Sequence, residues 1–153
     1  MVFDTVMADS KRGIKLMNQA LAKGHRVTLQ YIHQPLMKAV ENSITRAMDK
    51  DNGRIVPAAV VAATHLRAQQ ALYELAAHYA ADPRVSVKVI DHENFAARPS
   101  SLAELKSKRY TQSMEELQQQ AVKHARQYLE TQSHQTTLTD DLKSRILELS
   151  EGK

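Results

Sequence analysis

Apolar and polar positions alternate in two short segments of the chain, and this alternation predicts β-strands. The segments are Arg26–Ile32 and Val85–Ile90, and both are rich in β-branched residues. Val2–Val6 is a third and shorter strand candidate. Asp82-Pro83 lies just before the second segment, where proline is expected to end the preceding helix.

Apolar positions three to four residues apart predict helices between these strands. One helix follows the N-cap candidates Asp9 and Ser10 and stops at Gly24. A second follows Pro35, and a third opens at Pro57, because proline suits the first helical turn. Their apolar stripes contain Ile14, Met17 and Leu21, then Met37, Val40, Ile44 and Met48, then Val61, Thr64, Ala68, Ala71, Leu72, Leu75 and Tyr79.

The order of these elements predicts the fold class. Strands that alternate with helices favour an α/β fold, with a parallel sheet, flanking helices and right-handed crossovers. Three predicted strands are few, since about five or six are typical of a sheet. We therefore expect a partial sheet of the kind found in P-loop kinases, incomplete on its N-terminal side.

After Asp91 the chain becomes polar and mostly helical. Asn94–Arg98 is predicted as a loop. Capping-box signatures at Ser101–Glu104 and Ser113–Glu116 predict two helix starts, and Thr139 can cap a last helix. We place the core at residues 1–98 and a helical appendage at residues 99–153.

Composition narrows the class of protein. The length of 153 residues fits one domain, and no apolar run reaches the roughly 18 residues of a membrane span. The chain has no cysteine, which excludes disulfides, thiolate metal sites and a cysteine nucleophile and favours a cytoplasmic location.

The formal charge of +4 suits an anionic ligand such as a nucleotide. Nucleic-acid binding is a weaker interpretation, because aromatic residues make up only 5% of the chain and do not interleave with basic ones. The basic cluster of Lys106, Lys108 and Arg109 could contact phosphate or an acidic partner, and a solvated charged face is the favoured interpretation.

Two arginines flank a polar loop between the second and third predicted helices. Arg46 lies near the end of one helix, and Arg54 follows Gly53 on the loop before Pro57. A guanidinium can hold two phosphate oxygens at once, so the pair could form a lid over a phosphate chain. In the alternative interpretation Arg46 is only a cation near a helix C-terminus and Arg54 is a solvated loop residue.

Other candidates lie at strand ends. Asp4 ends the first predicted strand, where its carboxylate can accept a hydrogen bond from a substrate hydroxyl, with Thr5 assisting. The alternative role of Asp4 is to cap the following turn. The segment Asp91-His92-Glu93-Asn94 could contact an adenine or a ribose, or could be a polar junction.

Several catalytic signatures are absent from the sequence. No H-E-x-x-H pair and no G-x-S-x-G elbow occurs, so we assign no metal ligand and no catalytic residue. No phosphate-binding glycine loop can be written from the four glycines, which are Gly13, Gly24, Gly53 and Gly152.

In combination these segments resemble the zeta toxin family, which consists of P-loop small-molecule kinases of bacterial toxin–antitoxin systems. The resemblance covers roughly Val2–Asp91. It is carried by the strand ending in Asp4, the stretch Ala22-Lys23-Gly24-His25-Arg26-Val27, the turn His33-Gln34-Pro35, the helix with Arg46, and Gly53-Arg54-Ile55-Val56-Pro57.

The resemblance implies roles for these residues. The family transfers the γ-phosphate of ATP or GTP, with Mg²⁺, to the hydroxyl of a small molecule such as a UDP-amino sugar. Arg46 matches a helix arginine that contacts phosphate, and Arg54 matches a lid arginine. Asp4 stands where the family usually has a glutamate beside the substrate. A small helical antitoxin neutralises several members.

The family's Walker lysine and catalytic aspartate lie upstream of the segment at which this chain begins. The chain is therefore interpreted as the C-terminal part of such a kinase, inactive alone. It is expected to be a truncated coding unit, an isolated piece of a longer protein, or a piece completed by a second chain that supplies the P-loop. The alternative is a non-catalytic interaction protein on a degenerate kinase scaffold, which binds a partner through its C-terminal helices.

Overall fold

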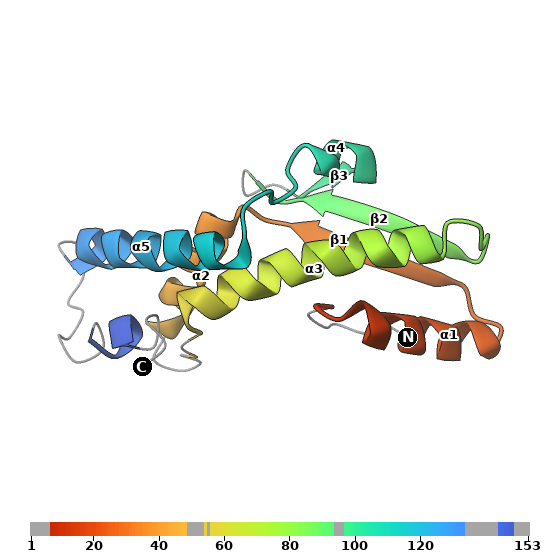
Figure 1. Cartoon of the computed structure of the whole chain (residues 1–153), viewed down its shortest axis with the longest axis horizontal. Helices are drawn as coiled ribbons and strands as arrows, with labels where there is room; N and C mark the ends of the chain where they lie inside the picture. Colours follow the sequence, from red (N-terminus) through yellow and green to blue (C-terminus); the bar gives the residue numbers. More distant parts are fainter. Residues whose placement is uncertain (1–6, 49–53, 55, 94–96, 134–143, 149–153) are drawn as a thin grey trace. The chain divides into compact units, whose positions relative to one another are not determined.

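The computed structural model describes residues 7–48, 54, 56–93, 97–133 and 144–148 (Figure 1). Helices and strands follow one another in the order α1 Ser10–Ala22, β1 Val27–His33, α2 Leu36–Ala47, α3 Ala58–His78, β2 Val85–Asp91, β3 Arg98–Ser100, α4 Leu102–Lys106 and α5 Met114–Ser133. Residues 144–148 are also helical.

The chain divides into two compact units, which are described separately. The first contains the described residues up to Gln34 together with Thr64–Tyr110. The second contains Pro35–Ala63 and the described residues from Thr111 onward. Each unit draws on both sides of residue 98, and the domain boundary placed there from the sequence stays a prediction.

The first unit contains a three-stranded sheet in the order β1-β2-β3. β1 and β2 are parallel, from the pair Val27 and Val85 to the pair His33 and Asp91. β2 and β3 are antiparallel. The α/β class, with a parallel strand pair and flanking helices, is therefore confirmed.

β3 is a difference from the sequence prediction, which placed a loop at Asn94–Arg98 and no strand after it. The strand is only Arg98–Ser100, and it pairs with the last residues of β2. Pro99 lacks an N–H donor, so it is tolerated at the edge of a sheet and gives no strand signal. A strand of only three residues is too short to show an alternating pattern, so the sequence could not predict it.

One face of the parallel pair packs on helices. Alternate strand residues lie against two hydrophobic clusters, one centred on Leu75 of α3 and the other on Leu72 of α3 and Leu105 of α4. The opposite face is mixed: it carries the exposed Ile32, and there the hydroxyls of Thr28 and Ser86 lie 2.9 Å apart across the strands.

The helix starts follow the predicted capping chemistry. The Asp9 carboxylate accepts hydrogen bonds from two backbone N–H groups at the start of α1. The capping box of Ser101 and Glu104 is present at α4, and Ser113 and Glu116 make the reciprocal bonds at α5. The observed hydrogen bonds confirm the predicted starts of these three helices.

The second unit is built from α2, the first turns of α3 and α5. Of the predicted stripe of α2, Val40 and Ile44 are buried, whereas Met37 and Met48 are only partly buried. The buried residues of this unit lie on α2, on the first turns of α3, on α5 at a spacing of four residues, and in residues 144–148. They are Leu36, Val40, Ile44, Ala47, Ala58, Ala62, Leu117, Ala121, Ala125, Leu129 and Ile146.

Candidate functional site

Both arginines of the predicted lid belong to the second unit. Arg46 lies in the last turn of α2, and Arg54 lies between α2 and α3. Both side chains are exposed, and neither makes an ion pair with another described residue. Both guanidinium groups are thus open to an anionic ligand.

Asp4 and Thr5, the predicted substrate contacts, lie outside the described residues, as does Asn94. Asp91, His92 and Glu93 are described. Their surroundings form the best-connected polar cluster of the first unit, at the carboxyl ends of the parallel strands. Open α/β sheets bind ligands at this edge.

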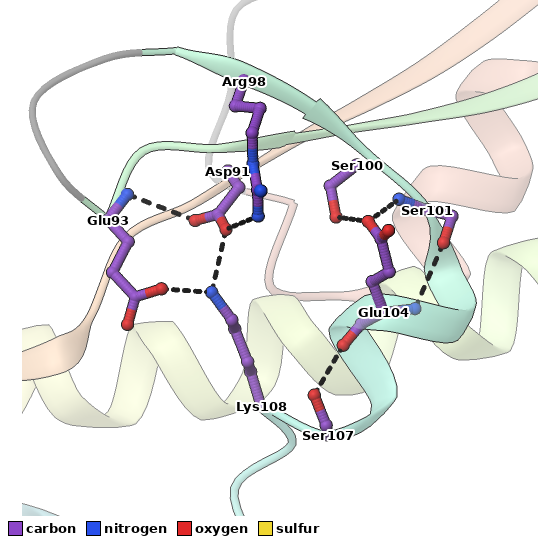
Figure 2. A network of polar contacts seen from close by, with 8 residues as sticks. All are labelled: Asp91, Glu93, Arg98, Ser100, Ser101, Glu104, Ser107 and Lys108. Carbon is purple, nitrogen blue, oxygen red and sulfur yellow. Dashed lines mark hydrogen bonds and ion pairs between the residues drawn. The ribbon is translucent and has the colours of Figure 1, made fainter.

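Asp91 is the centre of this cluster (Figure 2). Its residue is only 5% exposed. Lys108 donates to its Oδ2 atom at 2.8 Å, Arg98 donates to the same oxygen at 3.4 Å, and the Glu93 backbone N–H donates to Oδ1 at 3.1 Å. Lys108 also pairs with the Glu93 carboxylate. The hydrogen bond from Lys108 holds the pKa of Asp91 below its usual range, although partial burial opposes the shift.

Lys108 is a candidate that the sequence did not single out from its basic cluster. It was grouped with Lys106 and Arg109 as a solvated face, but its ammonium group has two acidic partners. The Arg109 guanidinium lies 5.0 Å from the ring centroid of Tyr73. Adjacent sequence positions gave no sign of either contact, because the partners lie far away along the chain.

Gln69 explains how Lys108 is held in place. This α3 side chain is 1% exposed, and its amide nitrogen donates to the Lys108 carbonyl at 3.2 Å. Its amide oxygen accepts from the Tyr110 backbone N–H at 2.9 Å. The buried amide thus fixes the segment that carries Lys108 to α3.

A second set of hydrogen bonds fixes β3 to α4 (Figure 2). The Glu104 carboxylate accepts from the Ser100 hydroxyl at 2.6 Å and from the Ser101 backbone N–H at 3.2 Å. These bonds hold the pKa of Glu104 below its ordinary value. Since β3 also carries Arg98, this network helps to position one cation of the Asp91 cluster.

Two histidines complete the carboxyl edge. His33, the register partner of Asp91, is 4% exposed, and its Nδ1 atom has no hydrogen-bond partner among the described residues. Burial lowers the pKa of His33 and Lys108 adds to the effect, whereas Asp91 and Glu93 oppose it. Burial and the nearby His33 lower the pKa of His65 on α3. Both imidazoles are therefore neutral at physiological pH.

These shifts predict a loss of stability on mild acidification. A histidine whose folded-state pKa is depressed binds more protons when unfolded, so stability falls as pH drops below the unfolded value of about 6.5. Chemical denaturation between about pH 7 and 5 should show this slope, and His33→Gln should reduce it. His25→Gln is the control, because His25 is exposed. An unchanged slope in the His33 variant would contradict the assignment.

The comparison with protein families gives one decisive match. A family model described as zeta toxin matches residues 1–98 of the chain. The chain belongs to the zeta toxin family. The predicted resemblance is thereby confirmed, and membership indicates a kinase-like toxin function of the kind that is typically paired with an antitoxin. No curated protein and no solved structure is significantly similar to the chain.

Two further properties bear on this zeta toxin family member. Among its described residues, no helix is both long enough and apolar enough to cross a membrane. In the same part of the chain, no group of three histidine, cysteine, aspartate or glutamate side chains is placed to hold a metal ion. The family match includes Arg46, Arg54 and Asp91, whereas Lys108 and α5 lie beyond it.

Proposed function

We propose that this zeta toxin family member is part of a phosphotransferase that moves the γ-phosphate of ATP or GTP to a small-molecule hydroxyl, such as that of a UDP-amino sugar. Arg46 and Arg54 bind the phosphate being transferred. Asp4 and Thr5 contact the acceptor. A P-loop that this sequence does not contain, from a second chain or from another part of a longer protein, completes the site, and an antitoxin is the expected inhibitor.

The observation that supports this proposal best is the exposure of both arginines around one loop. Negative charge spreads over the transferred phosphate as the acceptor oxygen bonds to phosphorus and the bond to the leaving diphosphate breaks. Two guanidinium groups that have no ion pair to another described residue can share this charge. The two guanidinium groups suit phosphate, and among the described residues no group of three histidine, cysteine, aspartate or glutamate side chains is placed to hold a metal ion, so we assign no residue to Mg²⁺.

The carboxyl edge of the sheet is less accessible to the acceptor or the nucleoside than the two exposed arginines are to phosphate. Lys108 and Arg98 already occupy Oδ2 of Asp91. A ligand hydroxyl would have to displace Lys108 or bind Glu93, whose side chain is 48% exposed. We therefore keep Asp4 and Thr5 as the proposed acceptor contacts.

Binding of inorganic tripolyphosphate tests the role of the arginines. Arg46→Ala and Arg54→Ala should each weaken binding about tenfold in calorimetry at low salt, because each removes a hydrogen-bonded charge. Arg12→Ala is the matched control, since it removes an exposed arginine of α1, and it should change the dissociation constant by less than about twofold. Equal affinity in all four proteins would refute the phosphate role.

Turnover tests the need for a P-loop that this sequence does not contain. The purified chain should neither hydrolyse ATP nor phosphorylate a UDP-amino sugar, because its sequence contains no phosphate-binding glycine loop. Activity of this chain alone, abolished in Arg54→Ala, would show that the phosphate loop is not required.

The alternative function, partner binding through the C-terminal helices, receives less support. The apolar stripe of α5 is already buried within the second unit, where Ala121, Ala125 and Leu129 are each 0% exposed. A partner would have to bind the polar face of α5.

A further inference from the structure

The helix α5 lies outside the residues matched by the family model, yet it provides much of the core of the second unit. Leu117, Ala121, Ala125 and Leu129 follow one another at intervals of four and are at most 2% exposed. Alanine at the two central positions lets a neighbouring helix approach closely. The most extensive helix–helix packing of α5 is with α2, which carries Arg46.

Two side-chain contacts fix the register of α5 on α2. His124 Nε2 lies 3.0 Å from Glu41 Oε1, and the Tyr128 hydroxyl lies 3.3 Å from Thr45 Oγ1. From the first contact to the second, the residue number rises by four on α2 and by four on α5. The two helices therefore run in the same direction, and their side chains stay paired over one helical turn. Arg46 directly follows Thr45, so the second contact lies in its own turn.

The direction of each hydrogen bond can be assigned. Lys38 binds Oε2 of Glu41, and the bonds from Lys38 and His124 keep the pKa of Glu41 low although partial burial opposes them. A carboxylate only accepts hydrogen bonds, so His124 Nε2 donates. The Thr45 hydroxyl donates to the Glu41 carbonyl at 3.0 Å, which leaves Tyr128 as the donor to Thr45.

α5 also contacts the other side of the loop. The Gln118 amide donates to the Ala59 carbonyl in the first turn of α3 at 3.3 Å. Ser43 of α2 donates to the Val56 carbonyl at 3.4 Å, next to the start of α3. One helix thus joins the two helices that flank Arg54.

We propose that α5 is a positioning element for the arginine hairpin, defined as α2 with Arg46 in its last turn, Arg54, and the first turns of α3. His124 and Tyr128 are the positioning residues, and they act through Glu41 and Thr45. The expected effect on phosphate binding rests on the proposed function. The mechanical part, which is the stabilisation of α2 around Arg46 by α5, does not.

Native-state cleavage by trypsin tests the mechanical part in the full chain. Arg46 lies within a helix, so cleavage after it requires local opening, and its rate follows the population of the open form. The double variant His124→Ala, Tyr128→Phe should accelerate this cleavage about tenfold, because it removes two hydrogen bonds. Cleavage after Arg12 in α1 of the first unit is the internal reference and should change less than about twofold.

Two further variants separate positioning from general packing. His124→Gln retains a donor that can reach Glu41 and should restore most of the protection that His124→Ala loses. Lys123→Ala, at the neighbouring exposed position of α5, should leave cleavage unchanged. Equal acceleration after Arg46 and Arg12 would mean that the variants only lower global stability, and this result would overturn the proposal.

Tripolyphosphate binding then links the inference to function. If the arginine variants and the double variant all weaken binding, both proposals are supported. If only the arginine variants weaken it and cleavage after Arg46 is unchanged in the double variant, the positioning role of α5 is refuted while the phosphate role stands. If the arginine variants bind normally while the double variant opens α2, the phosphate role is refuted and the mechanical role of α5 stands.

Discussion

Leu75→Ala should lower the free energy of unfolding by about 3 kcal/mol, the largest effect that we expect from a single substitution in this protein. Leu75 is 0% exposed and packs with Met17, Leu21 and Tyr79 in the core of the first unit. The cost combines the lost transfer of buried carbon atoms from water with the cavity that remains.

The cavity should be hard to fill, because the residue of the neighbouring helix α1 that faces Leu75 is Gly13, which has no side chain. A methyl group built on Gly13 of α1 would lie 2.9 Å from Leu75 Cδ1, so the α1 backbone already approaches this leucine closely. Gly13→Ala should therefore strain the native protein, and Leu75→Ala should relieve most of this strain, leaving the contact of the new methyl group with Met7 Sδ at 3.1 Å. The double variant should be more stable than Leu75→Ala alone, since alanine also favours the helix.

Equilibrium denaturation with urea, followed by circular dichroism, measures these effects. Val60→Ala on the same helix is the control, because Val60 is 48% exposed, and it should change stability by less than about 0.5 kcal/mol. A loss below about 1 kcal/mol for Leu75→Ala would show that the helices can relax around the missing side chain.

Asp91→Ala should have the second largest effect, a destabilisation of about 2 kcal/mol. The substitution removes the acceptor of Lys108, Arg98 and the Glu93 backbone N–H from a position that is 5% exposed. Lys108 keeps Glu93 as a partner, which limits the loss. The interaction between Lys108 and Asp91 is partly screened by water because the Lys108 side chain is 29% exposed.

Asp91→Asn separates the charge from the shape of the side chain. The folded-state pKa of Asp91 lies below its unfolded value of about 3.9, so its stabilising contribution is present above that pH and is lost as the pH falls through the folded pKa. The free energy of unfolding of the asparagine variant should lack the decrease at low pH that protonation of Asp91 causes. Arg98→Ala is the control, because this side chain is 72% exposed and lies 3.4 Å from the carboxylate. A larger loss for Arg98→Ala than for Asp91→Ala would be inconsistent with the central role of Asp91.

Local signals in the sequence were sufficient to predict most helices and the parallel strands. Caps at Asp9, Ser101 and Ser113 act within one helical turn, so residue type and spacing identify them. Gly24 follows α1 with a positive φ of 79°, as expected of a glycine that ends a helix.

Contacts between distant segments could not be predicted in this way. Lys108 reaches Asp91 across 17 residues of sequence, and Gln69 binds the Lys108 backbone across 39 residues. The arginine pair could be found because both residues flank one loop. Its availability to a ligand needed the structure, since exposure depends on what packs nearby.

The interleaved construction of the two units has a consequence for how the protein is made. Ribosomes release a chain from its N-terminus, and domains generally fold as units when their residues have emerged. The first unit needs residues up to Tyr110, and the second needs α5. Neither unit can therefore finish folding while the ribosome is still translating the family-matched segment, and both arginines are made long before the helix that we propose positions them. A nascent chain that stalls after residue 98 should present the apolar face of α2 to chaperones and proteases.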